Sequence, residues 1–169
     1  MITLILGGSG SGKSRAAEEL TGTLPPPVTY VATWVPSAED PDMRARVETH
    51  RARRPPDWAS LEVAGDLGGA LRSIAGSVLV DALGTWVASA PGFAVDADDL
   101  CAALRDRAGD TVVVSDEVGL GVHPPTGAGR RFRDALGAVN QAVAASADEV
   151  WLVVAGRVLP LAVPRWAGR

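Results

Sequence analysis

Two kinds of segment alternate along this chain. Short, nearly continuous apolar runs, typical of strands buried on both faces of a sheet, occupy residues 2–6, 28–33, 77–83, 111–118 and 149–156. Stretches typical of helices occupy residues 14–22, 41–54, 66–75, 96–108 and 128–146. This alternation predicts an α/β fold with a mostly parallel central sheet and helices on both faces. Residues 157–169 allow either a short final strand or a loose end, because they contain prolines and a glycine.

The composition fits one globular domain. With 47% hydrophobic and 21% charged residues, the 169-residue chain can bury a sizeable core, and we expect a single domain over residues 1–169. No segment approaches the roughly eighteen apolar residues of a membrane span, so we expect none, and a cytoplasmic protein. The single cysteine, Cys101, is expected to pack inside a helix, since no metal-ligand spacing surrounds it.

The charge pattern excludes one class of partner and leaves local anion sites open. A net charge of −4 and a pI of about 5.1 argue against a protein that binds nucleic acid through bulk charge. Arginines nevertheless gather at residues 44–54 and 130–133, where they form either local anion sites or solvated helix faces.

A glycine-rich motif lies directly between the first predicted strand and the first predicted helix. Residues 7–14, GGSGSGKS, fit the P-loop pattern G-x-x-x-x-G-K-[ST], and Lys13 is the only lysine among 16 basic residues. The glycines let backbone N–H groups turn toward phosphate, Lys13 reaches the β- and γ-phosphates, and Ser14 can ligate Mg²⁺. The motif therefore predicts a P-loop NTPase-like fold with a RecA-like sheet. Its expected nucleotide-binding residues are Gly7, Gly8, Ser9, Gly10, Ser11, Gly12, Lys13 and Ser14.

Carboxylates at the ends of other predicted strands are candidates for a second metal ligand. Asp81 ends the apolar run VLVD and is the first candidate, because strand ends of such sheets converge beside the P-loop. Asp116 and Glu117 end another apolar strand and are candidates for the second metal ligand for the same reason. Spacing along the chain does not rank the three.

One of the two histidines stands among five arginines in residues 44–54, RARVETHRARR. If this segment is helical, Arg46, His50 and Arg54 share one face. Either this is a solvated basic face, or it is an anion site in which His50 does chemistry. Nearby positive charge disfavours the imidazolium, and a neutral imidazole nitrogen is what a nucleophile needs.

The order of several motifs resembles that of one enzyme family. They are GGSGSGKSR, VTYVAT, RARVETHRARRPPDW, VLVDALGTW, VSDEVGLGV, GRRFRDALGAVNQ and ADEVWLVVAG. Together they resemble the bifunctional adenosylcobinamide kinase and adenosylcobinamide-phosphate guanylyltransferases of cobalamin biosynthesis, over nearly the whole chain. The most specific match is His-Arg-x-x-Arg-Pro followed by Trp.

The resemblance implies two reactions. ATP or GTP phosphorylates adenosylcobinamide, and GMP is then transferred from GTP to adenosylcobinamide phosphate through a histidine that matches His50, with release of pyrophosphate. It also implies a homo-oligomer, a trimer, with GTP, ATP and Mg²⁺ as ligands. Beyond residues 7–14, its implied nucleotide contacts fall on Thr33, Trp34, Val35, Arg51, Ala52, Arg53, Arg54, Glu62 and Asp81.

The chain departs from the family pattern after one strand. The family usually has Asn where this chain has Asp116, and often Pro-Glu-Asn where it has Pro124-Pro125-Thr126. His123 has no counterpart and is expected to be a loop residue.

Two other functions stay open. One is a P-loop kinase of another small metabolite, in which His50 only binds substrate. The other is a nucleotide-dependent switch or binding module; against it, the chain has no Asn-Lys-x-Asp guanine-reading motif, since its one lysine lies in the glycine loop.

Overall fold

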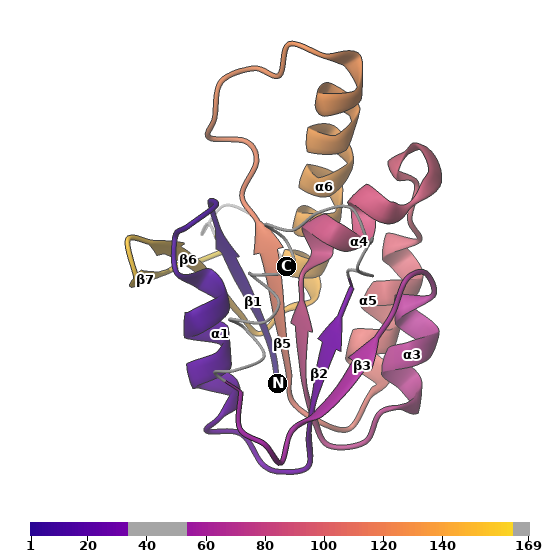
Figure 1. Ribbon diagram of the computed structural model, residues 1–169, viewed down its shortest axis with the longest axis vertical. Helices are drawn as coiled ribbons and strands as arrows, with labels where there is room; N and C mark the ends of the chain where they lie inside the picture. Colours follow the sequence, from indigo (N-terminus) through magenta and orange to yellow (C-terminus); the bar gives the residue numbers. More distant parts are fainter. Residues whose placement is uncertain (34–53, 164–169) are drawn as a thin grey trace.

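The described part of the chain, residues 1–33 and 54–163 of the computed structural model, forms one sheet with helices on both faces (Figure 1). The strands are β1 (Ile2–Gly7), β2 (Val28–Ala32), β3 (Ala59–Glu62), β4 (Ser77–Asp81), β5 (Thr111–Asp116), β6 (Glu149–Val154) and β7 (Arg157–Pro160). The helices are α1 (Lys13–Thr21), α3 (Leu67–Ser73), α4 (Leu83–Ser89), the short 3₁₀ turn η1 (Pro91–Phe93), α5 (Ala97–Asp106) and α6 (Gly127–Ser146). The predicted α/β class is confirmed.

The seven described strands lie in the order β3-β2-β4-β5-β1-β6-β7. The first six in this order are parallel to their neighbours, and only β7 runs antiparallel, to β6. Because β1 lies between β5 and β6, the glycine loop that follows it emerges near the middle of the carboxyl edge.

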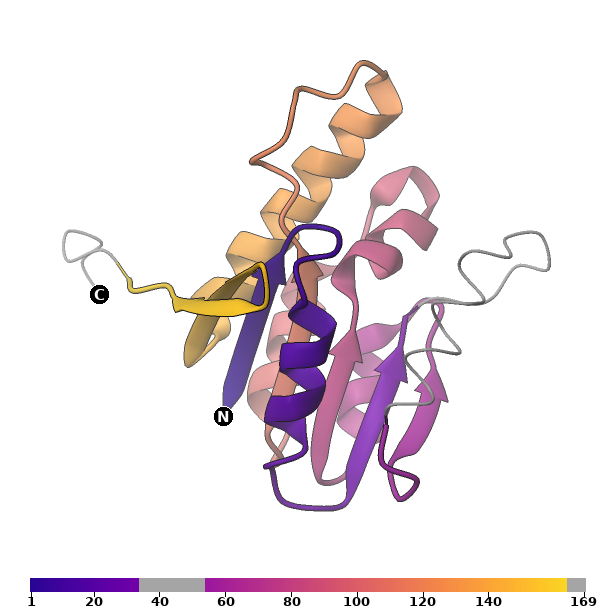
Figure 2. The same cartoon turned by 60° about the vertical axis from the view of Figure 1, so that its left-hand side comes forward.

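The two faces of the sheet are covered unequally (Figure 2). Helix α1 lies on one face, where Ala17 belongs to a buried apolar cluster that includes Ile5, Leu79 and Val114. Helices α3, α4, α5 and α6 cover the other face and enclose the larger apolar cluster, which includes Cys101 as predicted. Alternation along each strand sends successive side chains to opposite faces, so both faces need apolar residues. This explains the nearly continuous apolar runs in the sequence.

Several predicted boundaries are wrong in an instructive way. The apolar run 77–83 is not one strand: β4 ends at Asp81, and Leu83, Trp86 and Val87 form the buried side of α4. A short apolar run does not distinguish a strand from the first turn of a helix. The predicted strands 111–118 and 149–156 end earlier, at Asp116 and Val154.

Two elements lie where no strand was securely predicted. Strand β3 was not predicted at all; its four residues are exposed, and pairing with β2 rather than an apolar pattern defines it. In the 157–169 segment, the short-strand alternative is confirmed over Arg157–Pro160. The predicted helix 41–54 lies outside the described residues except for Arg54, which is in a bend.

A half-buried arginine joins two loops at the amino edge of the sheet. Arg107 donates hydrogen bonds to the backbone carbonyls of Ile74 and Gly76, before β4, and to Gly109, Asp110 and Thr111, where β5 begins. Burial lowers the pKa of its guanidinium below the ordinary value.

None of the described helices is long and apolar enough to cross a membrane.

Candidate active site at the glycine loop

The glycine loop folds into a tight turn between β1 and α1. Gly10 and Gly12 have φ values of 70° and 93°, in the left-handed region that favours glycine, and Ser11 N donates to the carbonyl of Gly8 at 3.2 Å. Helix α1 starts immediately after Gly12, which as N-cap has no side chain, and the N–H of Lys13 donates to Ser11 Oγ at 3.3 Å. Its amino end therefore directs N–H groups and the positive end of the helix dipole toward the loop.

The turn between β6 and β7 braces the loop from outside. Gly156 N donates to the carbonyl of Ser11 at 2.8 Å. A Cβ atom on Gly12 would come within 3.3 Å of the Gly156 Cα, so the two glycine backbones are in close contact. The loop is held by the edge hairpin as well as by its own strand and helix.

Lys13 and Ser14 each face a carboxylate from a neighbouring strand. The Lys13 Nζ lies 2.7 Å from Asp116 Oδ1 and 3.3 Å from the carbonyl of Gly8, and the side chain of Lys13 is only 12% exposed. The Ser14 Oγ donates to Asp81 Oδ1 at 3.4 Å. Two consecutive residues of the loop thus meet two different strands.

Strand register brings these carboxylates to one place. Asp116 pairs with Gly7 across β5 and β1, and Asp81 pairs with Val114 across β4 and β5. Val114 packs on the α1 face, and residues two apart on a strand share a face, so both carboxylates project toward α1. The structure therefore separates the three candidates: Asp81 faces Ser14, Asp116 faces Lys13, and Glu117 turns back to accept from the N–H of Gly119.

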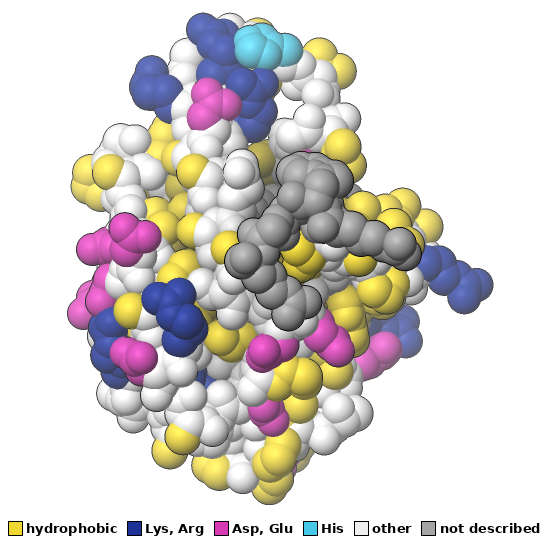
Figure 3. All heavy atoms as spheres, turned by 180° about the vertical axis from the view of Figure 1, so that it is seen from behind, with side chains coloured by type: hydrophobic (Ala, Val, Ile, Leu, Met, Phe, Trp, Pro, Cys, Tyr) yellow, Lys and Arg dark blue, Asp and Glu magenta, His cyan; other side chains and the backbone are white. Residues whose placement is uncertain are grey.

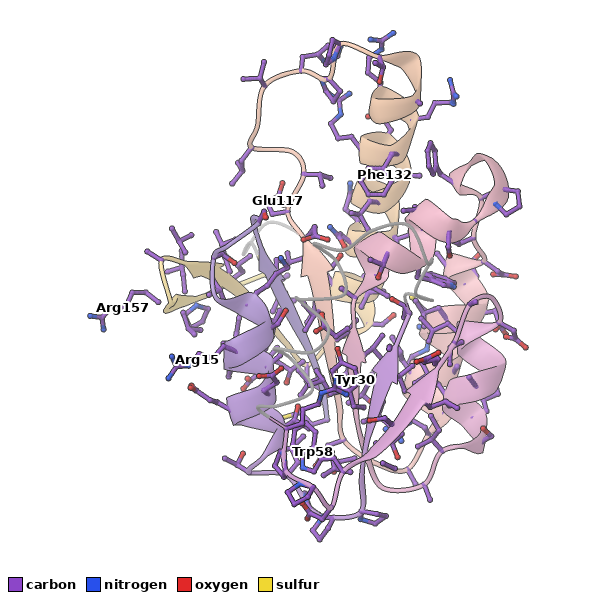
Figure 4. All side chains as sticks on the ribbon, in the orientation of Figure 1. Arg15, Tyr30, Trp58, Glu117, Phe132 and Arg157 are labelled. Atoms are coloured by element: carbon purple, nitrogen blue, oxygen red, sulfur yellow. The ribbon has the colours of Figure 1, made fainter. Side chains whose placement is uncertain are left out.

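Tyr30, which is labelled in Figure 4, contacts the carboxylate of Asp81. Its hydroxyl donates to Asp81 Oδ2 at 3.0 Å, and the side chain is buried. Burial and the charge of Asp81 raise the pKa of Tyr30 above its ordinary value, although the nearby Arg54 acts in the opposite direction. The phenol therefore stays protonated and remains a donor. Sequence reasoning missed Tyr30; its only signal was its place on the same strand face as apolar positions that pack on α1.

Arg54 is close to this carboxylate. Its guanidinium lies 3.6 Å above the centre of the Tyr30 ring, in cation–π contact, and it donates to Ser60 Oγ at 3.2 Å. The residue that ends the predicted arginine-rich segment is therefore next to the group that orients Asp81.

The other predicted contact residues differ in their placement. Thr33 is fully buried, and its hydroxyl bonds within the protein, to the carbonyl of Ala82 and to Thr85 Oγ1 at 2.6 Å. Glu62 is the last residue of β3 and is exposed. It pairs with Ala32 of β2, which in turn pairs with Asp81 of β4. A nucleotide contact by either residue stays a prediction. The remaining predicted residues, Trp34, Val35, His50, Arg51, Ala52 and Arg53, lie outside the described part of the chain.

The second arginine group lies on the projecting start of α6, beyond the carboxyl edge of the sheet (Figures 1 and 3). Arg130 donates to the carbonyls of Pro124 and Pro125, and Arg133 lies 3.0 Å from His123 Nδ1 and pairs with Asp134. These contacts hold the loop before α6, so His123 is a loop residue as predicted. Among the described residues no group of three or more His, Cys, Asp or Glu side chains could hold a metal ion.

Solved structures share this fold, and one of them illustrates the likeness. An ATPase from a bacterial type III secretion system superposes with a TM-score of 0.59 at 11% identity, over 89% of this chain. The chain spans 50% of the length of that ATPase chain, and at this identity the likeness concerns the fold alone.

Sequence comparisons identify nearer relatives. The chain is 38% identical to the bifunctional adenosylcobalamin biosynthesis protein CobP of Pseudomonas aeruginosa, over 95% of this chain and 97% of the relative. It is 39% identical to CobU of Salmonella typhimurium, which carries the same description, over 92% and 97%. The sequence model of one family, described as cobinamide kinase / cobinamide phosphate guanyltransferase, matches residues 3–161. A match of that extent, on a P-loop fold with relatives of this identity, shows that the chain belongs to the cobinamide kinase / cobinamide phosphate guanyltransferase family.

Proposed function

We propose that this protein catalyses two successive reactions on adenosylcobinamide. In the first, ATP or GTP phosphorylates the hydroxyl of the aminopropanol arm. In the second, GMP passes from GTP to that phosphate and gives adenosylcobinamide-GDP and pyrophosphate. The observation that carries the proposal is the family match over residues 3–161, in a chain whose glycine loop and facing carboxylates lie together.

The glycine loop is the proposed phosphate cradle for both nucleotides. Backbone N–H groups of residues 8–14 and the amino end of α1 would bind the phosphate oxygens. As the bond between the γ-phosphorus and the β-phosphate oxygen breaks and the substrate oxygen bonds to phosphorus, the substrate hydroxyl releases its proton to water. Lys13, which is on the cradle's inner side with 12% exposure, offsets the negative charge on the departing diphosphate.

Ser14 and Asp81 are the residues that would hold Mg²⁺. Their oxygens are 3.4 Å apart, and a hydroxyl with one carboxylate suits a hard cation that takes its other ligands from water and phosphate. When bound, Mg²⁺ neutralises phosphate charge. Tyr30 then serves to orient Asp81, since its hydroxyl engages the carboxylate oxygen that does not face Ser14.

We infer that His50 carries GMP in the second reaction. A neutral imidazole nitrogen attacks the α-phosphorus of GTP, the bond to the β-phosphate oxygen breaks, and pyrophosphate leaves. An oxygen of adenosylcobinamide phosphate then attacks the same phosphorus, and the nitrogen–phosphorus bond breaks. The position of Arg54 beside Tyr30 and Asp81 supports this, because Arg54 follows His50 by only four residues in the sequence.

The histidine step has a direct test. Full-length protein is incubated with Mg²⁺ and GTP labelled at the α-phosphate, and the label is followed on the denatured protein. We expect a bond that is stable to alkali and labile to acid, absent in His50→Ala, and released as adenosylcobinamide-GDP when adenosylcobinamide phosphate is added. His123→Ala is the matched control, since it removes the only other histidine. Unlabelled wild type, or equal labelling of His50→Ala, would contradict the proposal.

The two reactions should be partly separable. His50→Ala should still phosphorylate adenosylcobinamide, whereas Lys13→Ala should slow both reactions by roughly a hundredfold or more, because one cradle serves both nucleotides. Product analysis by mass spectrometry distinguishes the two outcomes. Loss of both activities in folded His50→Ala would refute separate roles.

A further inference from the structure

The one lysine of this chain already has an anionic partner within the protein. Lys13 Nζ and Asp116 Oδ1 are 2.7 Å apart, a distance typical of a charge-assisted hydrogen bond, and the two side chains are 12% and 35% exposed. Ser14 instead faces Asp81. Asp116 is therefore the carboxylate that any phosphate on Lys13 would encounter.

The fold holds Asp116 in this place from three directions. Its N–H and C=O lie in β5 next to Gly7, and its carbonyl accepts from Asn140 Nδ2 at 3.1 Å. Asn140 is itself fixed, because its side-chain oxygen accepts from Ser115 Oγ at 2.6 Å. The other carboxylate oxygen rests against the Cα of Gly84, where a Cβ would overlap it. These contacts fix the backbone of Asp116, and Gly84 limits its carboxylate on one side.

We propose that Asp116 is a specificity-determining residue of the glycine loop, which lowers the affinity for nucleotides that bring a β-phosphate to Lys13 relative to the affinity for the monophosphate. This rests on the proposed nucleotide-binding function. A ligand that brings a β-phosphate to Lys13 must share the ammonium with Asp116 and place its own negative charge beside that carboxylate. The Lys13–Asp116 contact competes with binding of the β-phosphate, and the repulsion between the phosphate and the Asp116 carboxylate weakens binding further.

The opposition depends on the number of phosphates. Lys13 in a P-loop reaches the β- and γ-phosphates, so a nucleoside monophosphate does not compete for the ammonium. Removal of the charge of Asp116 should therefore raise the affinities for GDP and for a non-hydrolysable GTP analogue, and should leave the affinity for GMP unchanged. Replacement of Asp116 by an isosteric amide is expected to raise the first two affinities about tenfold, or about 1.4 kcal/mol.

The experiment compares Asp116→Asn with wild type by isothermal titration calorimetry of the full chain, with Mg²⁺ and with GMP, GDP and the α,β-methylene analogue of GTP, in which the bond that His50 is proposed to cleave is blocked. Asp116→Ala is the second variant, and thermal unfolding establishes that both are folded. The control is Glu19→Gln, which removes one negative charge from α1 at an exposed ion pair with Arg15. It should change no affinity by more than about twofold.

Lys13 itself supplies an independent measurement. Because it is the only lysine, isotope labelling of lysine gives a single side-chain NMR signal. We expect this signal to move when GDP is added to wild type but not with GMP, and to differ in Asp116→Asn before any nucleotide is added.

The outcomes distinguish a failure of the proposed role of Asp116 from a failure of the proposed nucleotide-binding function. Tighter GDP and GTP-analogue binding with constant GMP binding supports the role of Asp116. Equal or weaker binding of GDP and the analogue by both Asp116 variants, with wild type binding normally, overturns this role and leaves the proposed function standing. A wild type that binds no nucleotide overturns both.

Discussion

The Tyr30 hydroxyl is the sharpest single test of how the site is supported. Tyr30→Phe removes the donor to Asp81 Oδ2 and keeps the ring on which the guanidinium of Arg54 lies. Ser14 still faces the other oxygen of Asp81. The variant therefore changes one hydrogen bond in a site whose shape is otherwise preserved.

The expected magnitude follows from burial and charge. Tyr30 is 6% exposed, so water does not replace the lost donor, and a hydrogen bond to a charged acceptor contributes about 1.5–3 kcal/mol. We expect the free energy of unfolding to fall by about 2 kcal/mol at neutral pH. If Asp81 holds Mg²⁺, the loss of this supporting contact should also weaken binding of the Mg²⁺–GTP complex about tenfold.

The pH dependence gives the same prediction a second readout. The pKa of Tyr30 is raised by burial and by Asp81, so the folded protein binds the phenol proton more tightly than the unfolded chain does. That contribution to stability is fully present below about pH 10, the ordinary tyrosine pKa, and is lost as the pH rises through the higher folded pKa. Wild type should therefore lose stability above about pH 10 more steeply than Tyr30→Phe.

The assay is simple because Tyr30 is the only tyrosine. Near-ultraviolet absorbance of tyrosinate follows its titration in the folded protein, and denaturant unfolding below and above about pH 10 gives the stabilities of both proteins. A folded-state titration at the ordinary tyrosine pKa, or a variant as stable as wild type at neutral pH, would refute the reasoning.

Two further variants test the frame around the site. Arg107→Met removes the donors that join the loops before β4 and β5 and leaves half-buried carbonyls without this partner. We expect a loss of about 2–3 kcal/mol in denaturant unfolding, with unchanged nucleotide affinity in the protein that remains folded. An Arg107→Met protein as stable as wild type would contradict this. Gly12→Ala forces a φ of 93° on an L-residue and crowds Gly156, so we expect about 1–2 kcal/mol of destabilisation and weaker GDP binding by calorimetry. Unchanged GDP binding would show that the loop tolerates the extra methyl group.

The parts of the molecule that are local in sequence were predictable. GGSGSGKS between an apolar run and a helical stretch predicts strand, turn and helix, because each step depends on neighbouring residues. The ends of β4 and β5 were likewise recognisable as places for carboxylates. What could not be predicted was which carboxylate meets which residue, since this depends on β5 lying between β1 and β4. Strand order is set by packing of the whole sheet.

Other features carry no signal along the chain. Strand β3 has four exposed residues and exists through its hydrogen bonds to β2, so no apolar pattern marks it. Tyr30 resembles any aromatic residue in a buried strand, and its role depends on a partner fifty-one positions away. The fold class therefore follows from periodicity, whereas the contacts of the site follow from tertiary structure.

The place of β1 in the sheet has a consequence for how the protein is made. During synthesis residues 2–14 leave the ribosome before β5 and β6 do, yet β1 pairs with β5 and β6 among the described strands, and Ser11 accepts a hydrogen bond from Gly156. The residues of the phosphate cradle are thus made well before the strands and the turn that hold them, and the cradle is complete only after residue 156 has been added. A growing chain that lacks the last hairpin should already contain β2 and β4 but should not yet bind nucleotide.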